Sequence, residues 1–78
     1  MFFVYFYDLR PKNPKDYNKL KRRFYYHFNK LNLIKSYWKT KSVLVVPLEL
    51  ESIIDNFFVS FKPDIEVYKL QTKYIEEL

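Results

Sequence analysis

The sequence contains no cysteine and no glycine, and each absence excludes a class of chemistry. Without cysteine, no disulfide stabilises the fold and no thiolate acts as a nucleophile or metal ligand. Without glycine, the chain cannot form the phosphate-binding loops of P-loop and Rossmann proteins, which depend on that residue. We therefore exclude nucleotide-cofactor enzymes of these classes. The lack of cysteine also fits a reducing, cytoplasmic environment.

Long apolar runs and targeting signals are lacking as well. No apolar stretch approaches the ~20 residues needed to span a bilayer, so we expect no membrane segment. Met1 leads directly into apolar residues, with neither a basic segment nor a small-residue cleavage site, so we expect no signal peptide. With 78 residues, the chain is expected to form one domain, residues 1–78, with a small core.

Aromatic residues, by contrast, are abundant: eight Phe, eight Tyr and one Trp make up 22% of the chain. One small core cannot enclose so many large side chains. We infer that part of the aromatic surface meets a partner, most simply a second copy of the chain. The composition, rich in Lys, Asn, Tyr and Phe, also indicates an AT-rich genome.

The net charge of +5 is unevenly distributed. Between Arg10 and Lys41 many cations face a single acidic residue, Asp16, whereas acidic residues prevail after Lys41. This asymmetry predicts a polyanionic partner, DNA or RNA, for the first half of the chain. The alternative is a basic face that meets only solvent.

Apolar patterning predicts the strands. Residues 1–9 and 43–46 are apolar on both faces, which is typical of interior strands. Residues 65–70 alternate as a half-exposed strand does, and residues 33–40 alternate imperfectly. Residues 39–42 are a candidate hairpin turn, although one long strand bent at Thr40 is an alternative. Residues 71–78 either extend the last strand or form a tail.

Two amphipathic helices are predicted between these strands. Asn13 is a suitable N-cap and Pro14 a suitable first residue for a helix that ends near 29–32. Its apolar stripe consists of Tyr17, Leu20, Phe24, His27 or Phe28, and Leu31, and its opposite side is a basic ridge. Residues 50–61 follow the helical pattern too, with acidic residues near the start.

The order strand, helix, strand, strand, helix, strand predicts an α+β, ferredoxin-like βαββαβ fold. It consists of a four-stranded antiparallel sheet with both helices on one face. The two apolar strands should then be central, and the opposite face of the sheet should be open. The first strand offers that open face one of two sets of side chains: Phe2, Val4 and Phe6, or Phe3, Tyr5 and Tyr7.

Four segments resemble a known family in their order. They are the strand end at 6–9 (FYDL), the basic helix at 19–31, Leu33-Ile34-Lys35, and the strand at 41–45 (KSVLV). This order resembles the CRISPR-associated protein Cas-two family and its relative, virulence-associated protein D, over residues 1–70. The resemblance implies a ferredoxin-like homodimer joined through its sheets, and engagement of nucleic acid. It also implies that Asp8 matches the aspartate that holds a divalent metal near the dimer axis in active members.

Asp8 is the candidate catalytic residue and metal ligand. Mg²⁺ needs only one or two carboxylates besides water and phosphate oxygens, and a two-fold axis would supply the second carboxylate. Water activated by the metal could then attack a phosphodiester. The alternative is that Asp8 caps the turn at residues 10–13.

The candidate nucleic-acid-binding residues are cations that would contact phosphates in a salt-sensitive, sequence-tolerant manner. They are Lys15, Lys19, Arg22, Arg23, Lys30, Lys35 and Lys39. Tyr37 and Trp38 could stack on unpaired bases, although we favour a place in the core or a dimer interface for Trp38. For His27, packing is expected rather than a role as general base.

Two functions follow from these features. The first is a small homodimeric nucleic-acid-binding protein, with metal-dependent endonuclease activity through Asp8 as its extension. The second is a non-catalytic interaction module, encoded by a virus or plasmid, that binds a host protein through its aromatic surface.

Overall fold

The structure, a computed structural model, describes residues 1–34 and 37–78. The strands are β1 (Phe2–Leu9), β2 (Trp38–Thr40), β3 (Val43–Pro47) and β4 (Ile65–Thr72). The helices are α1 (Tyr17–Asn29) and α2 (Glu51–Val59), each preceded by a short 3-10 turn, η1 (Pro14–Asp16) and η3 (Leu48–Leu50). The predicted βαββαβ order and the α+β class are confirmed.

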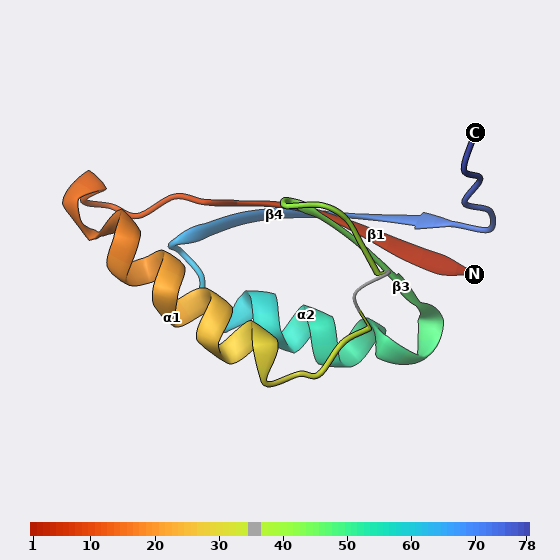
Figure 1. Cartoon of the computed structure of the whole chain (residues 1–78), viewed down its shortest axis with the longest axis horizontal. Helices are drawn as coiled ribbons and strands as arrows, with labels where there is room; N and C mark the ends of the chain where they lie inside the picture. Colours follow the sequence, from red (N-terminus) through yellow and green to blue (C-terminus); the bar gives the residue numbers. More distant parts are fainter. Residues whose placement is uncertain (35–36) are drawn as a thin grey trace.

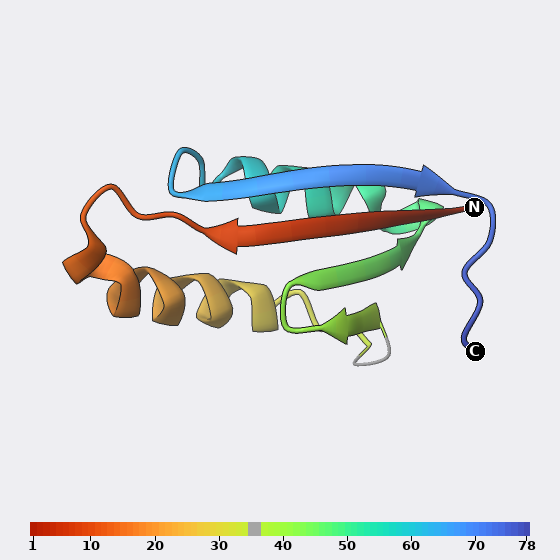
Figure 2. The ribbon, with the colours of Figure 1, turned by 90° about the horizontal axis from the view of Figure 1, so that it is seen from above.

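The sheet is antiparallel throughout, with the strand order β2-β3-β1-β4. Both helices lie on the same side of it (Figure 1), and the view from above shows β1 between β3 and β4 (Figure 2). The two strands that are apolar on both faces are therefore central, as predicted. In each of these strands one row of side chains packs into the core below the helices, and the other row belongs to the face that no helix covers.

The two faces of β1 have different roles. Phe3, Tyr5 and Tyr7 are buried in the core cluster together with side chains of both helices. Side chains alternate along a strand, so Phe2 and Phe6 belong to the opposite face, which no helix covers. The structure thus decides between the two sets of side chains that the sequence left open.

The core is largely aromatic. Phe24, Phe28 and Phe58 are fully buried, and the ring of Tyr7 lies 5.6 Å from that of Phe24 and 5.1 Å from that of Phe58. Such tilted and edge-to-face pairs stabilise the core beyond the area they bury. The core therefore encloses many of the aromatic residues, while others, such as Phe6 and Tyr68, stay exposed.

The first helical segment begins as predicted. The Asn13 side chain accepts a hydrogen bond of 3.1 Å from the backbone N–H of Lys15, and Pro14 opens η1. Helix α1 ends at Asn29, and Asn32 follows with φ of 54°, a left-handed conformation that asparagine tolerates. Of the two candidates for the apolar stripe, Phe28 occupies the buried position. His27 is exposed, although its ring lies 5.2 Å from that of Tyr26 and 6.3 Å from that of Phe61.

The second strand is shorter than predicted. Residues 33–40 were expected to form it, but Leu33 and Ile34 are not in a strand and β2 covers only Trp38–Thr40. A turn at Lys41 and Ser42 leads into β3, so the hairpin, rather than one long bent strand, is confirmed. The apolar character of Leu33 and Ile34 is typical of a strand, but both residues belong to the connection after α1.

The end of the chain combines both alternatives for residues 71–78. Gln71 and Thr72 extend β4, whereas residues 73–78 have no regular secondary structure.

The second helix covers Glu51–Val59 rather than the whole predicted range 50–61. Among the described residues, no helix combines the length and the apolar character that crossing a membrane requires.

Candidate nucleic-acid interface

Helix α1 and the turn before it present a row of cations to solvent. Lys15, Lys19, Arg22 and Lys30 are all exposed, on the side away from the buried stripe of Leu20, Phe24 and Phe28. We call these four side chains the cationic face. In residues 1–34 and 37–78, the ion pairs involve other cations, namely Arg10, Arg23 and Lys69.

One member of the cationic face contacts an aromatic ring. The ammonium group of Lys30 lies 4.3 Å from the centroid of the Tyr26 ring. This cation–π contact holds the ammonium near the helix without neutralising its charge. The predicted basic ridge thus exists, and its charge remains available to an anion.

Arg23 occupies a different position from its neighbours. Its guanidinium lies 4.0 Å from a carboxylate oxygen of Asp64 and 5.5 Å from the centroid of the Phe61 ring. It therefore links α1 to the loop between α2 and β4. We expect Arg23 to contribute more to this contact than to phosphate binding, because its charge is partly compensated.

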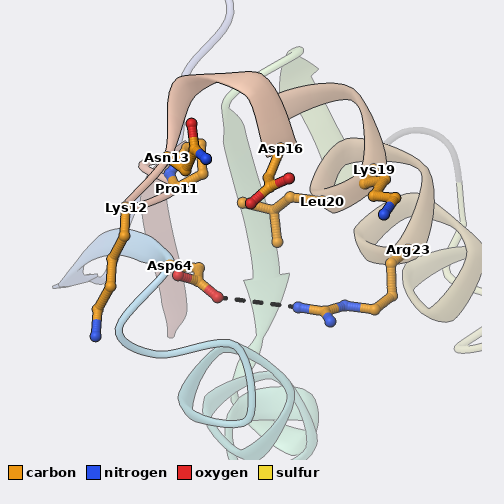
Figure 3. A pocket seen from close by; sticks show the side chains of 8 residues that line it. All are labelled: Pro11, Lys12, Asn13, Asp16, Lys19, Leu20, Arg23 and Asp64. Atoms are coloured by element: carbon orange, nitrogen blue, oxygen red, sulfur yellow. Dashed lines mark ion pairs between the residues drawn. The ribbon is translucent and has the colours of Figure 1, made fainter.

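A hollow of about 590 Å³ lies beside this ion pair, between the start of α1 and the loop before β4. Figure 3 shows Arg23 reaching across the hollow towards Asp64, with Lys19 on the same helix and Asp16 at the end of the preceding turn η1. The lining residues are Pro11, Lys12, Asn13, Asp16, Lys19, Leu20, Arg23 and Asp64. Its two carboxylates offset the cations, so the hollow is a weaker anion site than the cationic face.

The two remaining predicted cations lie elsewhere. Lys39 is exposed in β2, on the hairpin rather than on the helix. Lys35 is outside the described residues. Trp38, beside Lys39, is half-buried, and its ring lies 5.1 Å from that of Phe28. The structure thus places Trp38 against the core, in agreement with the favoured expectation.

The sequence interpretation missed a second cationic group. Lys21 on α1 and Lys41 in the hairpin turn are both exposed, and both line a hollow with Tyr25. The residues are far apart in the sequence, so only the position of the hairpin beside α1 brings them together. The regular spacing of Lys21 and Tyr25 on one helix flank was the only signal available beforehand.

Asp8 is exposed at the end of β1. Its carboxylate accepts a hydrogen bond of 2.9 Å from Nε of Arg10. The residue opposite it on β4 is Glu66, whose carboxylate accepts a hydrogen bond of 3.0 Å from the hydroxyl of Tyr68. Asp8 thus forms an ion pair with Arg10 and adjoins a second carboxylate.

The fit of a Mg²⁺ ion to this position is partial. Asp8 and Glu66 offer two carboxylates, the number that suits a Mg²⁺ ion which keeps water and phosphate oxygens. Both carboxylates are engaged by neighbouring side chains, and no group of three or more metal-ligating side chains occurs among the described residues. To hold a Mg²⁺ ion, Asp8 and Glu66 would have to exchange these contacts for the metal.

A separate polar cluster joins β1, β4 and α2. The hydroxyl of Tyr5 donates a hydrogen bond of 2.6 Å to Asp55, and Lys69 pairs with Asp55 at 2.8 Å and with Glu51 at 2.7 Å. Burial and the neighbouring carboxylate of Asp55 raise the pKa of Tyr5. Burial would raise the pKa of Asp55, but hydrogen bonds from Lys69 and Tyr5 outweigh it, so that pKa is lowered. The cluster fastens α2 to the sheet.

The face of the sheet opposite the helices is apolar. Its rows follow from the strand register: Val45, Val4 and Leu70 form one row, and Val43, Phe6 and Tyr68 form the next. Phe6, Tyr68 and Leu70 are 43%, 64% and 53% exposed. We call this surface the open sheet face. Contiguous exposed apolar side chains of this kind mark an interaction site.

Comparison with models of known protein families finds no match for this chain. Curated proteins and solved structures yield no match either. Function is therefore inferred from the chemistry of the chain's own side chains.

Proposed function

We propose that this protein binds nucleic acid, DNA or RNA, through the cationic face. The observation that supports the proposal most directly is the exposure of Lys15, Lys19, Arg22 and Lys30 without an ion pair among the described residues. Several acidic side chains already pair with other cations, as Asp55 does with Lys69 and Asp64 does with Arg23. A polyanion gains the most from cations whose charge no protein group compensates.

Binding by this surface depends on phosphates rather than on bases. Lysine and arginine on one helix face displace condensed counterions from the nucleic-acid backbone, so affinity falls steeply as the salt concentration rises. Such contacts carry little sequence information. The expected behaviour is therefore sequence-tolerant and strongly salt-dependent.

The proposal includes a homodimer formed through the open sheet face. The exposed side chains Phe6, Tyr68 and Leu70 are adjacent on two neighbouring strands, and a two-fold axis would pack this surface against its own copy. Helix α1 lies on the side of the sheet away from the open sheet face (Figure 1), so the cationic face would stay accessible in both copies. Two such faces per particle would increase the avidity for a long polyanion.

Phosphodiester hydrolysis through Asp8 is a second candidate function. The specific observation in its favour is that Asp8 and Glu66 are directly opposite each other on β1 and β4. A dimer that brought the two copies of this pair together would increase the number of carboxylate ligands. Asp8 would first have to exchange its contact with Arg10 for the metal, and a phosphate could take over that arginine.

Charge reversal tests the binding proposal. The double variant Lys19→Glu/Arg22→Glu should lose most of its affinity for a mixed-sequence oligonucleotide, measured by fluorescence anisotropy at low salt. The matched control is Lys62→Glu/Lys73→Glu, which changes the net charge equally at exposed positions outside α1. If both double variants lose affinity equally, net charge rather than the cationic face governs binding.

The same experiment distinguishes nucleic-acid binding from the alternative function, an interaction module that binds a host protein. A protein that docks onto a host protein through its aromatic surface would show no affinity for any oligonucleotide at low salt. Its partner binding would instead be sensitive to changes at Phe6 or Tyr68, which leave the cationic face intact.

A further inference from the structure

A groove follows the flank of α1 that faces the β2–β3 hairpin. Three adjoining hollows share the same two α1 residues, Lys21 and Tyr25. One of about 510 Å³ extends to Trp38, Thr40 and Lys41 of the hairpin. We call this continuous surface the flank groove. It adjoins the cationic face at Arg22, which lines one of the three hollows, whereas Lys21 and Tyr25 lie on the flank of α1 nearer the hairpin.

The aromatic side chains of the flank groove are held firmly. The ring of Tyr25 packs edge-to-face on that of Phe24 at 5.2 Å, and its hydroxyl donates a hydrogen bond of 3.5 Å to the backbone carbonyl of Lys41. The ring of Trp38 packs on Phe28 at 5.1 Å. Both rings are half-buried, so each has one side fixed by the core and a part left open. Fixed aromatic surfaces suit the stacking of a flat ring, since little side-chain entropy is lost.

The charge of the flank groove is positive. Lys21 and Lys41 flank the aromatic side chains and are exposed; neither takes part in an ion pair in the described part of the chain. Asp8 is the one carboxylate among the residues that line the three hollows, and Arg10 compensates its charge. A ligand with a flat ring and phosphates on either side of it would match this arrangement.

We propose that the flank groove binds a single-stranded segment of nucleic acid, with an unpaired base against Tyr25 and Trp38 and its flanking phosphates on Lys21 and Lys41. The inference rests on the proposed function, which it extends by naming the strandedness of the target. In a duplex, the bases are stacked on one another and cannot enter a groove between a helix and a hairpin. An unpaired base has a free face, and base–aromatic stacking tolerates any sequence.

The test compares one oligonucleotide as a single strand and as a duplex, at equal salt, using fluorescence anisotropy. The wild-type protein should prefer the single strand. Tyr25→Leu should weaken single-strand binding by about fivefold or more, which is the lower limit expected from the loss of one stacked base. It should leave duplex binding unchanged. The matched control is Tyr74→Leu, the same exchange at an exposed tyrosine outside both the groove and the cationic face.

A second pair of variants tests the phosphate contacts without changing the rings. Lys41→Ala should reduce single-strand binding more than Lys62→Ala, an equal loss of charge outside the groove.

A 2-aminopurine base in the strand reports on stacking, because stacking quenches its fluorescence. Its fluorescence should fall when the strand binds the wild type and should fall less when the strand binds Tyr25→Leu. Circular dichroism of both variants confirms that the fold is retained.

The outcomes separate this inference from the proposal on which it rests. Equal affinity for single strand and duplex, with Tyr25→Leu behaving like Tyr74→Leu, would overturn single-strand binding by the flank groove, while the cationic face remained the binding surface. Competition by polyglutamate as strong as that by the oligonucleotide would overturn it too, since a stacking site needs bases. No binding of any oligonucleotide would overturn both.

Discussion

Replacing Leu70 by glutamate is expected to abolish self-association. Leu70 is 53% exposed on the edge strand β4 and lies opposite Val4 of the central strand β1 on the open sheet face. In a two-fold dimer each copy contributes this leucine to the interface, so one substitution alters the contact twice. The change also places a carboxylate against apolar side chains of the other copy.

The magnitude follows from the exposure of Leu70. Burying the exposed half of a leucine contributes about 1 kcal/mol per copy, and leaving an unpaired polar group in its place costs about 1–3 kcal/mol more per copy. The two copies together should therefore weaken the dimer by about 4 kcal/mol or more, roughly a thousandfold in the dissociation constant. A dimer of moderate affinity would become monomeric at any practical concentration.

Sedimentation velocity over a concentration series measures the effect. The matched control is Leu48→Glu, the same exchange at a leucine that is 50% exposed in η3, on the connection between β3 and α2. The wild type and Leu48→Glu should dimerise, and Leu70→Glu should not. A monomeric wild type, or a dimer that Leu70→Glu leaves intact, would refute the proposal that the open sheet face is the dimer interface.

Three further predictions concern the candidate active residue and the fold. Asp8→Asn should eliminate any Mg²⁺-dependent cleavage of nucleic acid while leaving the melting temperature nearly unchanged, because Asp8 and Arg10 are both exposed; equal cleavage by both proteins would remove Asp8 from the proposal. The lowered pKa of Asp55 means that its carboxylate stabilises the fold above the ordinary value of 3.8 and loses this effect as the pH falls below it. The stability difference between wild type and Asp55→Asn in urea denaturation should therefore shrink on acidification, and a constant difference would contradict the role of the cluster. Phe24→Ala should lower the free energy of unfolding by about 3–5 kcal/mol, since Phe24 is fully buried among the rings of Phe28, Phe57 and Phe61; a loss below ~1 kcal/mol would contradict its central place.

The central strands and the first helix were predictable because their signals are local. Residues 2–7 of β1 and 43–46 of β3 are all apolar or aromatic, a pattern typical of the central strands of a sheet. Asn13 and Pro14 specify the helix start through their own backbone preferences. The limits of β2 were not predictable, because Leu33 and Ile34 have the same apolar character as a strand.

The parts of the candidate site that combine residues distant in the sequence were harder to predict from the sequence. The spacing of the cations on α1 predicted the cationic face, since one helix determines it. By contrast, the flank groove needs Lys21 and Tyr25 of α1 beside Lys41 of the hairpin, and no sequence pattern relates these positions. The same holds for Tyr5, Asp55 and Lys69, which come from three elements and meet only in the folded chain.

The salt dependence of oligonucleotide binding tests the cationic face most directly. If the four cations of the cationic face and Lys21 and Lys41 of the flank groove each neutralise one phosphate of a single strand, the slope of log K against log salt should be about −4 for the wild type. For Lys19→Gln/Arg22→Gln, the slope should become less steep by about 1.5, because two phosphate contacts are lost. A slope near zero, or one that this double variant leaves unchanged, would contradict nucleic-acid binding by the cationic face.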